Sequence, residues 1–312
     1  MTKLRQKRTA EMTRPEINPA LGLNLVSQRT LERNTGRVSV VIPAHNEAAT
    51  VAEVVAESRR GLDLIGAQGE VIVSASGCTD GTAKVAADAG ANVVEAPIGK
   101  GSAVRAGLDE ADGDIVCLVD GDIRYFGDRP LVAILVEPIL QGIADACITD
   151  LYWRPLYPQM WLHGFFAPIA GYLFPEILPK VGSTPWSGQR AAVRELWPTN
   201  LPDGFTVDLE ILMHWNRRAL RLRPVLADDW VNPQRPKPEL MAQELKVIFQ
   251  HAIETGRAQN NSWPALERWY DRIHAAMVEY QPDSDQPQQF EQDLLLKSLN
   301  WLKSEIGKIQ ES

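Results

Sequence analysis

The stretch Ile115-Val116-Cys117-Leu118-Val119-Asp120-Gly121-Asp122 decides how this sequence is interpreted. An apolar run rich in β-branched residues stops at two aspartates that are separated by one glycine. Such a run is typical of a buried strand in a parallel sheet. Because ligands of open α/β sheets bind beyond the carboxyl ends of the strands, we expect Asp120 and Asp122 to stand at the edge of a site.

The Asp-Gly-Asp sequence has two interpretations. Two carboxylates with a small residue between them suit a hard divalent cation, which in turn holds substrate phosphates. Alternatively, the three residues form only a polar turn, in which Gly121 supplies unusual backbone angles. The stretch alone leaves both open, and the segments before it favour the first.

Size and composition indicate a globular enzyme. The 312 residues allow one large domain or two joined lobes, and 45% of them are hydrophobic. The net charge of −8 argues against non-specific nucleic-acid binding, which needs a basic face. Cys78, Cys117 and Cys147 have no CxxC spacing, so we expect reduced thiols without a zinc site or disulfide.

The sequence predicts a cytoplasmic protein without an integral membrane segment. The first residues are polar and basic, unlike a signal peptide. The most apolar stretches, 131–140 and 161–174, are shorter than the roughly 20 residues that a membrane span needs.

Strands and helices alternate through the first part of the chain. Strands are expected at 38–43, 70–73, 91–95 and 115–119, and helices at 50–60, 83–89 and 102–110. Pro43 is expected to end the first strand, and Asn46 to cap the helix after it. The alternation predicts an α/β fold with a parallel, doubly wound sheet.

The later part of the chain is a mixture of helices and strands. Helices are expected at 130–141, 161–178 and 206–218, and strands at 144–153 and 221–226. Residues 189–197 are expected to form a strand and a short helix. Three further helices are expected at 239–255, 263–280 and 290–309. This pattern predicts a lobe of mixed structure followed by a helical tail.

Four polar loops follow the predicted strands and should meet at one edge of the sheet. They comprise residues 43–47, 74–82, 98–102 and 120–124. Lys100 lies between two glycines, where the backbone can approach a phosphate closely. Each loop alone could be a turn, a helix start or solvated surface, but four in succession favour a nucleotide site. Neither a Walker loop nor a GxGxxG fingerprint is present.

Together these segments resemble the nucleotide-sugar glycosyltransferases of family 2, which have the GT-A fold. The resemblance rests on residues 40–47, 76–82, Gly99-Lys100-Gly101 and Asp120-Gly121-Asp122, and it covers roughly residues 36 to 250. Residues 152–156, Ser187-Gly188-Gln189 and 204–208 are similar to the glucosyl-3-phosphoglycerate synthases, the retaining enzymes of family 81.

The resemblance implies a GT-A type, Rossmann-like, mostly parallel sheet flanked by helices, with a helical C-terminal extension. It also suggests four segments. Residues 1–36 would be a flexible N-terminal arm and 37–125 the nucleotide-sugar-binding half. Residues 126–238 would be the acceptor-binding half and 239–312 the helical tail. A homodimer is expected from the same resemblance.

The resemblance also implies UDP-glucose as donor, Mg²⁺ or Mn²⁺ as cofactor, and 3-phosphoglycerate or a similar small molecule as acceptor. It assigns the nucleoside to Pro43, Ala44, Glu47 and Ser76, and the uridine and phosphates to Lys100. The metal is assigned to Asp122, and the ribose or the metal shell to Asp120, with Gly121 also in the nucleotide-sugar site. Ser187 and Gly188 would line the sugar, and Asp208 would hold its hydroxyls.

Two positions differ from the family pattern. A histidine usually completes the metal site before the C-terminal helices, and Asn232 stands there. A glycine-rich patch usually carries an arginine for the acceptor phosphate, but residues 164–170 have none. Arg190, Arg235 and Lys237 are the candidates to replace it, and a less charged acceptor is the alternative.

The chemistry expected is sugar transfer, in which Lys100 and the metal stabilise the diphosphate leaving group. A retaining enzyme needs no side-chain base; in an inverting one Asp208 is the best candidate. Two other functions stay open at this point. One is nucleotidyl transfer, and the other is a non-catalytic nucleotide-binding protein that kept the fold.

Overall fold

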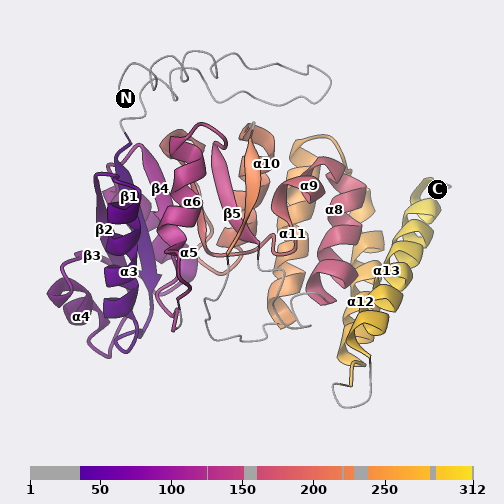
Figure 1. Cartoon of the computed structure of the whole chain (residues 1–312). Helices are drawn as coiled ribbons and strands as arrows, with labels where there is room; N and C mark the ends of the chain where they lie inside the picture. The colour runs from indigo at the N-terminus through magenta and orange to yellow at the C-terminus, as the bar shows by residue number, and fades with distance from the viewer. Residues whose placement is uncertain are drawn as a thin grey trace. The chain divides into compact units, whose positions relative to one another are not determined.

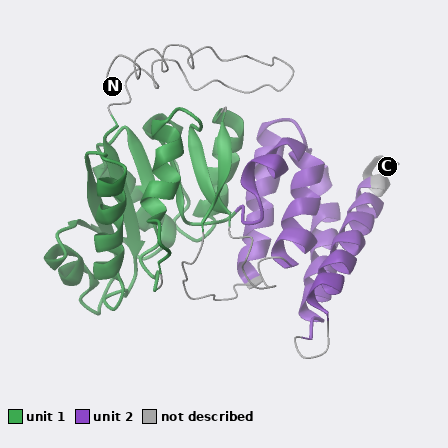
Figure 2. Ribbon diagram, in the orientation of Figure 1, with its two compact units in different colours: residues 1–150, 186–234 green, residues 151–185, 235–312 purple. Residues whose placement is uncertain are grey.

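The computed structural model describes residues 36–124, 126–150, 160–219, 221–227, 238–281 and 286–310. The N-terminal arm expected at 1–36 lies outside this range except for its last residue. Asn232 and Arg235 also lie outside it. The chain divides into two compact units, Met1–Asp150 with Trp186–Gln234, and Leu151–Pro185 with Arg235–Ser312 (Figure 2). The functional boundaries expected from the sequence stay a prediction.

The first unit is built on a seven-stranded sheet with the order β3-β2-β1-β4-β6-β5-β7 (Figure 1). The strands are β1 (Val38–Ala44), β2 (Gly69–Ser76), β3 (Asn92–Ala96), β4 (Ile115–Leu118), β5 (Ala146–Asp150), β6 (Arg190–Val193) and β7 (Leu222–Leu226). Neighbouring strands are parallel except at β6, which is antiparallel to both β4 and β5. The predicted α/β fold is confirmed, and the wholly parallel sheet becomes a mostly parallel one.

The central strand β1 sets the edge at which the loops meet. It pairs with β2 on one side and β4 on the other, with Val41 opposite both Ile72 and Leu118. Since all three strands run in the same direction, their carboxyl ends lie at the same edge. The chain segments after Ala44, Ser76 and Leu118 therefore leave the sheet together, as the sequence predicted.

Helices cover this sheet. They are α3 (Val51–Leu64), α4 (Thr82–Asp88), α5 (Lys100–Glu110), α6 (Leu131–Leu140) and α10 (Val207–Arg218), with a 3₁₀ turn at Arg194–Leu196. Figure 1 shows α3 and α6 side by side, and a Cβ built on Gly61 of α3 would lie 2.8 Å from Val132 of α6. Gly107 lets α5 approach the sheet in the same way, against Val41 and Ser74.

Two local predictions at the first loop are wrong. Pro43 does not end β1, which continues to Ala44 in register with β2; the Pro43 carbonyl accepts a hydrogen bond from the Gly121 amide at 3.3 Å. Asn46 does not cap α3, whose N-cap residue is Thr50. Asn46 instead has a left-handed backbone, with φ of 57°, and its Oδ1 accepts from the Thr79 amide.

Apolar strand residues and buried thiols fill the core. Val40, Val41 and Ile42 have no exposed surface, and neither do Cys117 and Cys147. All three cysteines are free, as predicted. Burial raises the pKa of the Cys147 thiol to about 12, so this side chain behaves as a small apolar group.

The second unit is helical. It comprises a π-helix (Trp161–Phe166), α8 (Ala167–Leu173), a 3₁₀ turn (Pro175–Ile177), α9 (Leu178–Val181), α11 (Pro238–Glu254), a 3₁₀ turn (Asn260–Ser262), α12 (Trp263–Val278) and α13 (Pro287–Gln310). The single helix expected at 161–178 is broken because Phe174 leaves helical angles and Pro175 follows it. Buried Trp269 of α12 donates to Ser298 of α13. Among the described residues, no helix is long and apolar enough to cross a membrane.

We expect the Gly107→Ala variant to lower the free energy of unfolding by about 1–3 kcal/mol, because overpacking outweighs the gain in helix propensity. The new Cβ would lie 2.2 Å from Val41 Cγ1 and 2.6 Å from Ser74 Oγ. Gly171→Ala in α8 is the control, since its Cβ would meet only the flexible Leu178 side chain at 3.3 Å. Urea unfolding measures both variants; equal stability of the two would contradict the close packing of α5.

Candidate active site

The first two loops at the carboxyl edge are tied to each other by short polar contacts. His45 Nδ1 lies 2.5 Å from the Ser76 carbonyl oxygen. The amide of Glu47 donates to Thr82 Oγ1 at 2.8 Å, and the amide of Ala48 donates to Asp80 Oδ2 at 3.0 Å. His45, which directly follows β1, is thereby connected to β2. These contacts fix the backbone of residues 43–47 before any ligand binds.

The start of α5 is held between β2 and the loop 201–203. The Gly99 amide donates to Ser76 Oγ at 2.9 Å, and the Gly101 amide donates to the Asp203 carbonyl at 2.8 Å. Side chains are excluded here, because a Cβ on Gly101 would lie 1.6 Å from the Pro202 carbonyl oxygen. Arg105 of α5 also binds Asp203. The two glycines thus serve a close backbone approach that fixes the position of Lys100.

Lys100 joins two carboxylates that are distant in sequence. Its Nζ lies 2.7 Å from Asp208 Oδ2 and 3.1 Å from Asp120 Oδ1, and the three side chains are 10–18% exposed. Burial alone would lower the pKa of Lys100, but the charges and hydrogen bonds of Asp120 and Asp208 outweigh it and raise the pKa. Lys100 is therefore a permanent cation and not a base.

Asp120 is held from the other side by the start of β6. Gln189 Nε2 donates to Asp120 Oδ2 at 2.8 Å. Gly188 packs so closely that a Cβ there would lie 2.4 Å from the same oxygen. Burial alone would raise the pKa of Asp120, but Lys100 and Gln189 lower it below its usual value. Asp120 is therefore ionised at neutral pH.

Gly121 lies against the end of β1, because a Cβ built on it would lie 3.2 Å from Ala44 Cβ. Thr50 Oγ1 donates to the Gly121 carbonyl at 2.7 Å, which anchors the turn to the start of α3. Asp122 is half-buried. Gly121 and Asp122 form the expected turn, but Gly121 is not among the glycines with a positive φ. The metal-binding interpretation of Asp120 and Asp122 stays a prediction. Among the described residues, no group of three or more His, Cys, Asp or Glu side chains is arranged to hold a metal.

The other predicted site residues fall into two groups. Pro43, Glu47 and Gly188 lie at the carboxyl edge as expected, and Ala44 is buried beneath it. The hydroxyls of Ser76 and Ser187 already have internal partners: Ser76 Oγ donates to Pro97 O at 2.7 Å, and Ser187 Oγ lies 2.5 Å from Thr149 Oγ1. These two serines shape the loops rather than offer free hydroxyls.

The prediction that Arg190 binds the acceptor does not fit the structure. Its side chain has no exposed surface. Nε donates to the Ser187 carbonyl at 2.9 Å, Nη1 donates to the Asp208 carbonyl at 2.7 Å, and Nη2 lies 3.4 Å from Asp208 Oδ1. A guanidinium enclosed in this way contacts Asp208 instead of a ligand.

Sequence reasoning missed the roles of Thr50, Thr149 and Gln189. Gln189 was part of a recognised motif, but its partner, Asp120, is 69 positions away in the chain. No local pattern marks such a contact, because β6 enters the sheet in the antiparallel direction.

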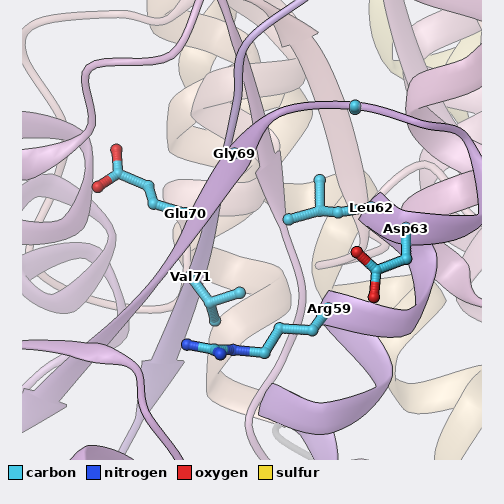
Figure 3. A pocket seen from close by; sticks show the side chains of 7 residues that line it. Arg59, Leu62, Asp63, Gly69, Glu70 and Val71 are labelled. Carbon is cyan, nitrogen blue, oxygen red and sulfur yellow. The ribbon is translucent and has the colours of Figure 1, made fainter.

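A hollow of about 250 Å³ lies at the opposite edge of the sheet, where β2 begins (Figure 3). Arg59, Asp63 and Glu70 are among the residues that line it. Glu70 accepts hydrogen bonds from Ser39 at 2.7 Å and from Asn92 at 3.1 Å, so its carboxylate joins strands. This hollow is a junction of structural contacts, apart from the four loops.

The fold and the carboxyl-edge site define a nucleotide-sugar glycosyltransferase of the GT-A type. A glycosyl transferase family 2 domain matches residues 39–192. Glucosyl-3-phosphoglycerate synthase of Mycobacterium tuberculosis is 34% identical over 235 residues, which cover 68% of this chain and 71% of that protein. The same enzyme of Mycolicibacterium smegmatis is 40% identical over 233 residues, covering 68% and 75%.

Solved structures agree. The M. tuberculosis synthase in complex with Mn²⁺, UDP and glucosyl-3-phosphoglycerate superposes with a TM-score of 0.59 at 28% identity, over 77% of this chain and 85% of that one. Its complex with Mn²⁺, UDP-glucose and glycerol 3-phosphate gives 0.57 at 27% identity, over 74% and 88%. The chain therefore belongs to the glycosyltransferase family of the glucosyl-3-phosphoglycerate synthases, and the predicted enzyme class is confirmed.

We expect the free energy of unfolding of Asp120→Asn to be lower than that of the wild type at neutral pH. In acid this difference should disappear. The folded-state pKa of Asp120 lies below its ordinary value of 3.8, so the ionised carboxylate stabilises the fold above that pH. The stabilisation is lost as the pH falls through the folded-state pKa. Urea unfolding in the presence of a chelator, between about pH 7 and pH 2, measures the difference.

Asp112→Asn is the control, because the Asp112 side chain is 58% exposed and forms a surface ion pair with Arg37. Its difference from the wild type should stay small at every pH. A difference for Asp120→Asn that does not change with pH would contradict the assignment of the buried ion pair.

Proposed function

We propose that the protein transfers a hexose, glucose in the first instance, from a UDP-sugar to a small hydroxylated acceptor such as 3-phosphoglycerate. The observation that carries the proposal is Lys100 held between Asp120 and Asp208 at the carboxyl edge of a family 2 domain. The related synthases, whose crystals contain UDP-glucose, Mn²⁺ and phosphorylated three-carbon acceptors, support the choice of donor and acceptor.

A divalent metal, Mg²⁺ or Mn²⁺, is part of the proposal, and the donor set fits it. Such ions are commonly bound through one or two carboxylates, with substrate phosphates completing the shell. Asp122 would be the main ligand, because both oxygens of Asp120 already accept from Lys100 and Gln189. Asn232 remains the proposed third ligand, although it lies outside the described residues. When bound, the metal would offset the charge of the leaving diphosphate.

The chain's own residues would supply the remaining steps. Lys100, a permanent cation, would stabilise negative charge on the diphosphate, as preorganised charges do in closed sites. Asp208, at the start of α10, would accept hydrogen bonds from sugar hydroxyls. The backbone around Pro43 and Glu47, fixed by its contacts with Ser76 and Thr82, would receive the nucleoside.

Fewer of the described residues bear on the acceptor side of the proposal than on the donor side. Arg190 is buried, so Arg235 and Lys237, which lie outside the described residues, are the remaining candidates for the acceptor phosphate. Glycosyltransferase AglJ of Haloferax volcanii, 32% identical over 59% of this chain, is a relative with a different name.

A homodimer and a cytoplasmic location complete the proposal. Leu296 and Leu299 are exposed on α13, where they could contact a second copy of the chain.

We expect Mn²⁺ to strengthen binding of UDP to the wild type, and Asp122→Asn to reduce that gain by at least about 10-fold, which corresponds to about 1.4 kcal/mol. The reason is the loss of a charged oxygen ligand. Isothermal titration calorimetry with UDP, with and without Mn²⁺, measures it. Asp112→Asn should keep the full gain. If the wild type bound UDP with the same affinity in the presence and absence of Mn²⁺, the metal would be removed from the proposal.

We expect transfer with retention, so an α-linked donor should give an α-linked product. Proton NMR of the product of UDP-glucose and 3-phosphoglycerate reports the anomer directly. A β-linked product would establish inversion and make Asp208 the candidate base. Glycerol and glycerol 3-phosphate serve as matched acceptors that differ only in the phosphate; equal rates with both would favour the less charged acceptor.

A further inference from the structure

Two consecutive residues at the start of β6 contact the two carboxylates that Lys100 joins. Gln189 donates to Asp120 Oδ2 at 2.8 Å, and Arg190 Nη2 lies 3.4 Å from Asp208 Oδ1. Together with the Lys100 contacts, these interactions close a ring: Lys100, Asp120, Gln189, Arg190 and Asp208. Each carboxylate is therefore held from two sides, by Lys100 and by one residue of β6.

Arg190 is the member of the ring that no substrate can reach. Its side chain is fully buried, and its guanidinium carbon lies 5.7 Å from the centre of the Trp215 ring. It donates to the main-chain oxygens of Ser187 and Asp208 as well as facing the Asp208 carboxylate. Burying such a charge is expensive unless it is paired and fully hydrogen-bonded. The contacts meet that condition.

The Oδ1 atom of Asp208 faces Arg190. Among the described residues this buried oxygen has no hydrogen-bond partner, and the Arg190 guanidinium lies 3.4 Å from it. Its Oδ2 accepts from Lys100 at 2.7 Å. Arg190 also holds the Asp208 carbonyl, which fixes the backbone at the start of α10. Without Arg190, both the carboxylate and its backbone would lose a restraint.

The charges of the ring balance. Lys100 and Arg190 carry two positive charges, and Asp120 and Asp208 carry two negative charges. Removing Arg190 would leave one ammonium shared between two carboxylates in a largely buried place. Because like charges in such a place repel, the carboxylates would move apart or draw in solvent. The separation of Asp120 and Asp208 thus depends on a residue outside the substrate's reach.

We propose that Gln189 and Arg190 are positioning residues, which set the separation of the Asp120 and Asp208 carboxylates around the Lys100 ammonium. This rests on the proposed function, in which Lys100 faces the diphosphate and Asp208 the sugar. Arg190 is the first residue of strand β6 and Gln189 directly precedes it, so both are anchored to the sheet, which suits a role in precise placement. Both residues act through another side chain, and neither is a catalytic residue.

The first test is the Arg190→Met variant of the full-length protein, assayed for transfer from UDP-glucose with Mn²⁺. We expect kcat to fall by about 10- to 100-fold, the range typical of small misplacements of reacting groups, while KM for UDP-glucose changes by less than about 3-fold. Arg190→Lys keeps the positive charge but loses the planar guanidinium group, so its kcat should lie between those of the wild type and Arg190→Met.

A double-mutant cycle separates positioning from a general structural effect. If Arg190 acts through Asp208, the Arg190→Met/Asp208→Asn double variant should have about the same kcat as Asp208→Asn alone. If the kcat of the double variant fell by the product of the two single losses, the proposal would be overturned. The cycle of Gln189→Met with Asp120→Asn should behave in the same way.

Arg221→Met is the matched control. Arg221 pairs with Asp145 at 2.5 Å, and Asp145 is buried in the same unit, at the opposite edge of the sheet. Its removal should lower the melting temperature at least as much as Arg190→Met, because it also leaves a buried carboxylate unpaired. Below that temperature kcat should stay within about 2-fold of the wild type. An equal loss of kcat in both variants would overturn the proposal.

If the wild type transfers no sugar, the proposed function is rejected, but the positioning role is not. Amide hydrogen exchange then tests the positioning role by itself. In Arg190→Met, peptides that cover residues 187–190 and the start of α10 should exchange faster than in the wild type, whereas Arg221→Met should leave them unchanged. Unchanged exchange in Arg190→Met would overturn the positioning role independently of activity.

Discussion

The structure of this site depends on one interaction, the ammonium of Lys100 placed between the carboxylates of Asp120 and Asp208. These groups come from α5, from the end of β4 and from α10, and their side chains are 10–18% exposed. Two carboxylates could not share so enclosed a place without a cation between them. The cation is positioned by backbone, because Gly99 and Gly101 press the start of α5 against residues 202 and 203.

The same interaction limits the chemistry that Lys100 can perform. A lysine serves as a base only when its surroundings lower its pKa, and here the two aspartates raise it. Lys100 is therefore suited to stabilise charge and not to remove a proton. This agrees with a glycosyltransferase, in which charge develops on a departing diphosphate, and it leaves the deprotonation of the acceptor to another group or to the leaving group itself.

The arrangement of the sheet explains why the site is rigid on one side. Three parallel strands end at a common edge, and the loops that follow them bind each other through His45, Thr50 and Ser76. The antiparallel strand β6 then enters beside β4 and brings Gln189 and Arg190 beneath the carboxylates. This edge of the sheet is thus built from side chains whose partners lie on neighbouring strands and helices.

The sequence by itself determined the α/β class, the strands that precede each loop, and the residues Lys100, Asp120 and Asp208, because hydrophobic periodicity and local motifs are properties of short segments. Only the tertiary structure decided that Lys100 joins two aspartates, that Gln189 holds Asp120, and that Arg190 is enclosed beneath Asp208. These contacts link residues 18 to 108 positions apart. Their geometry follows from strand order and from the reversed direction of β6, which no local pattern encodes.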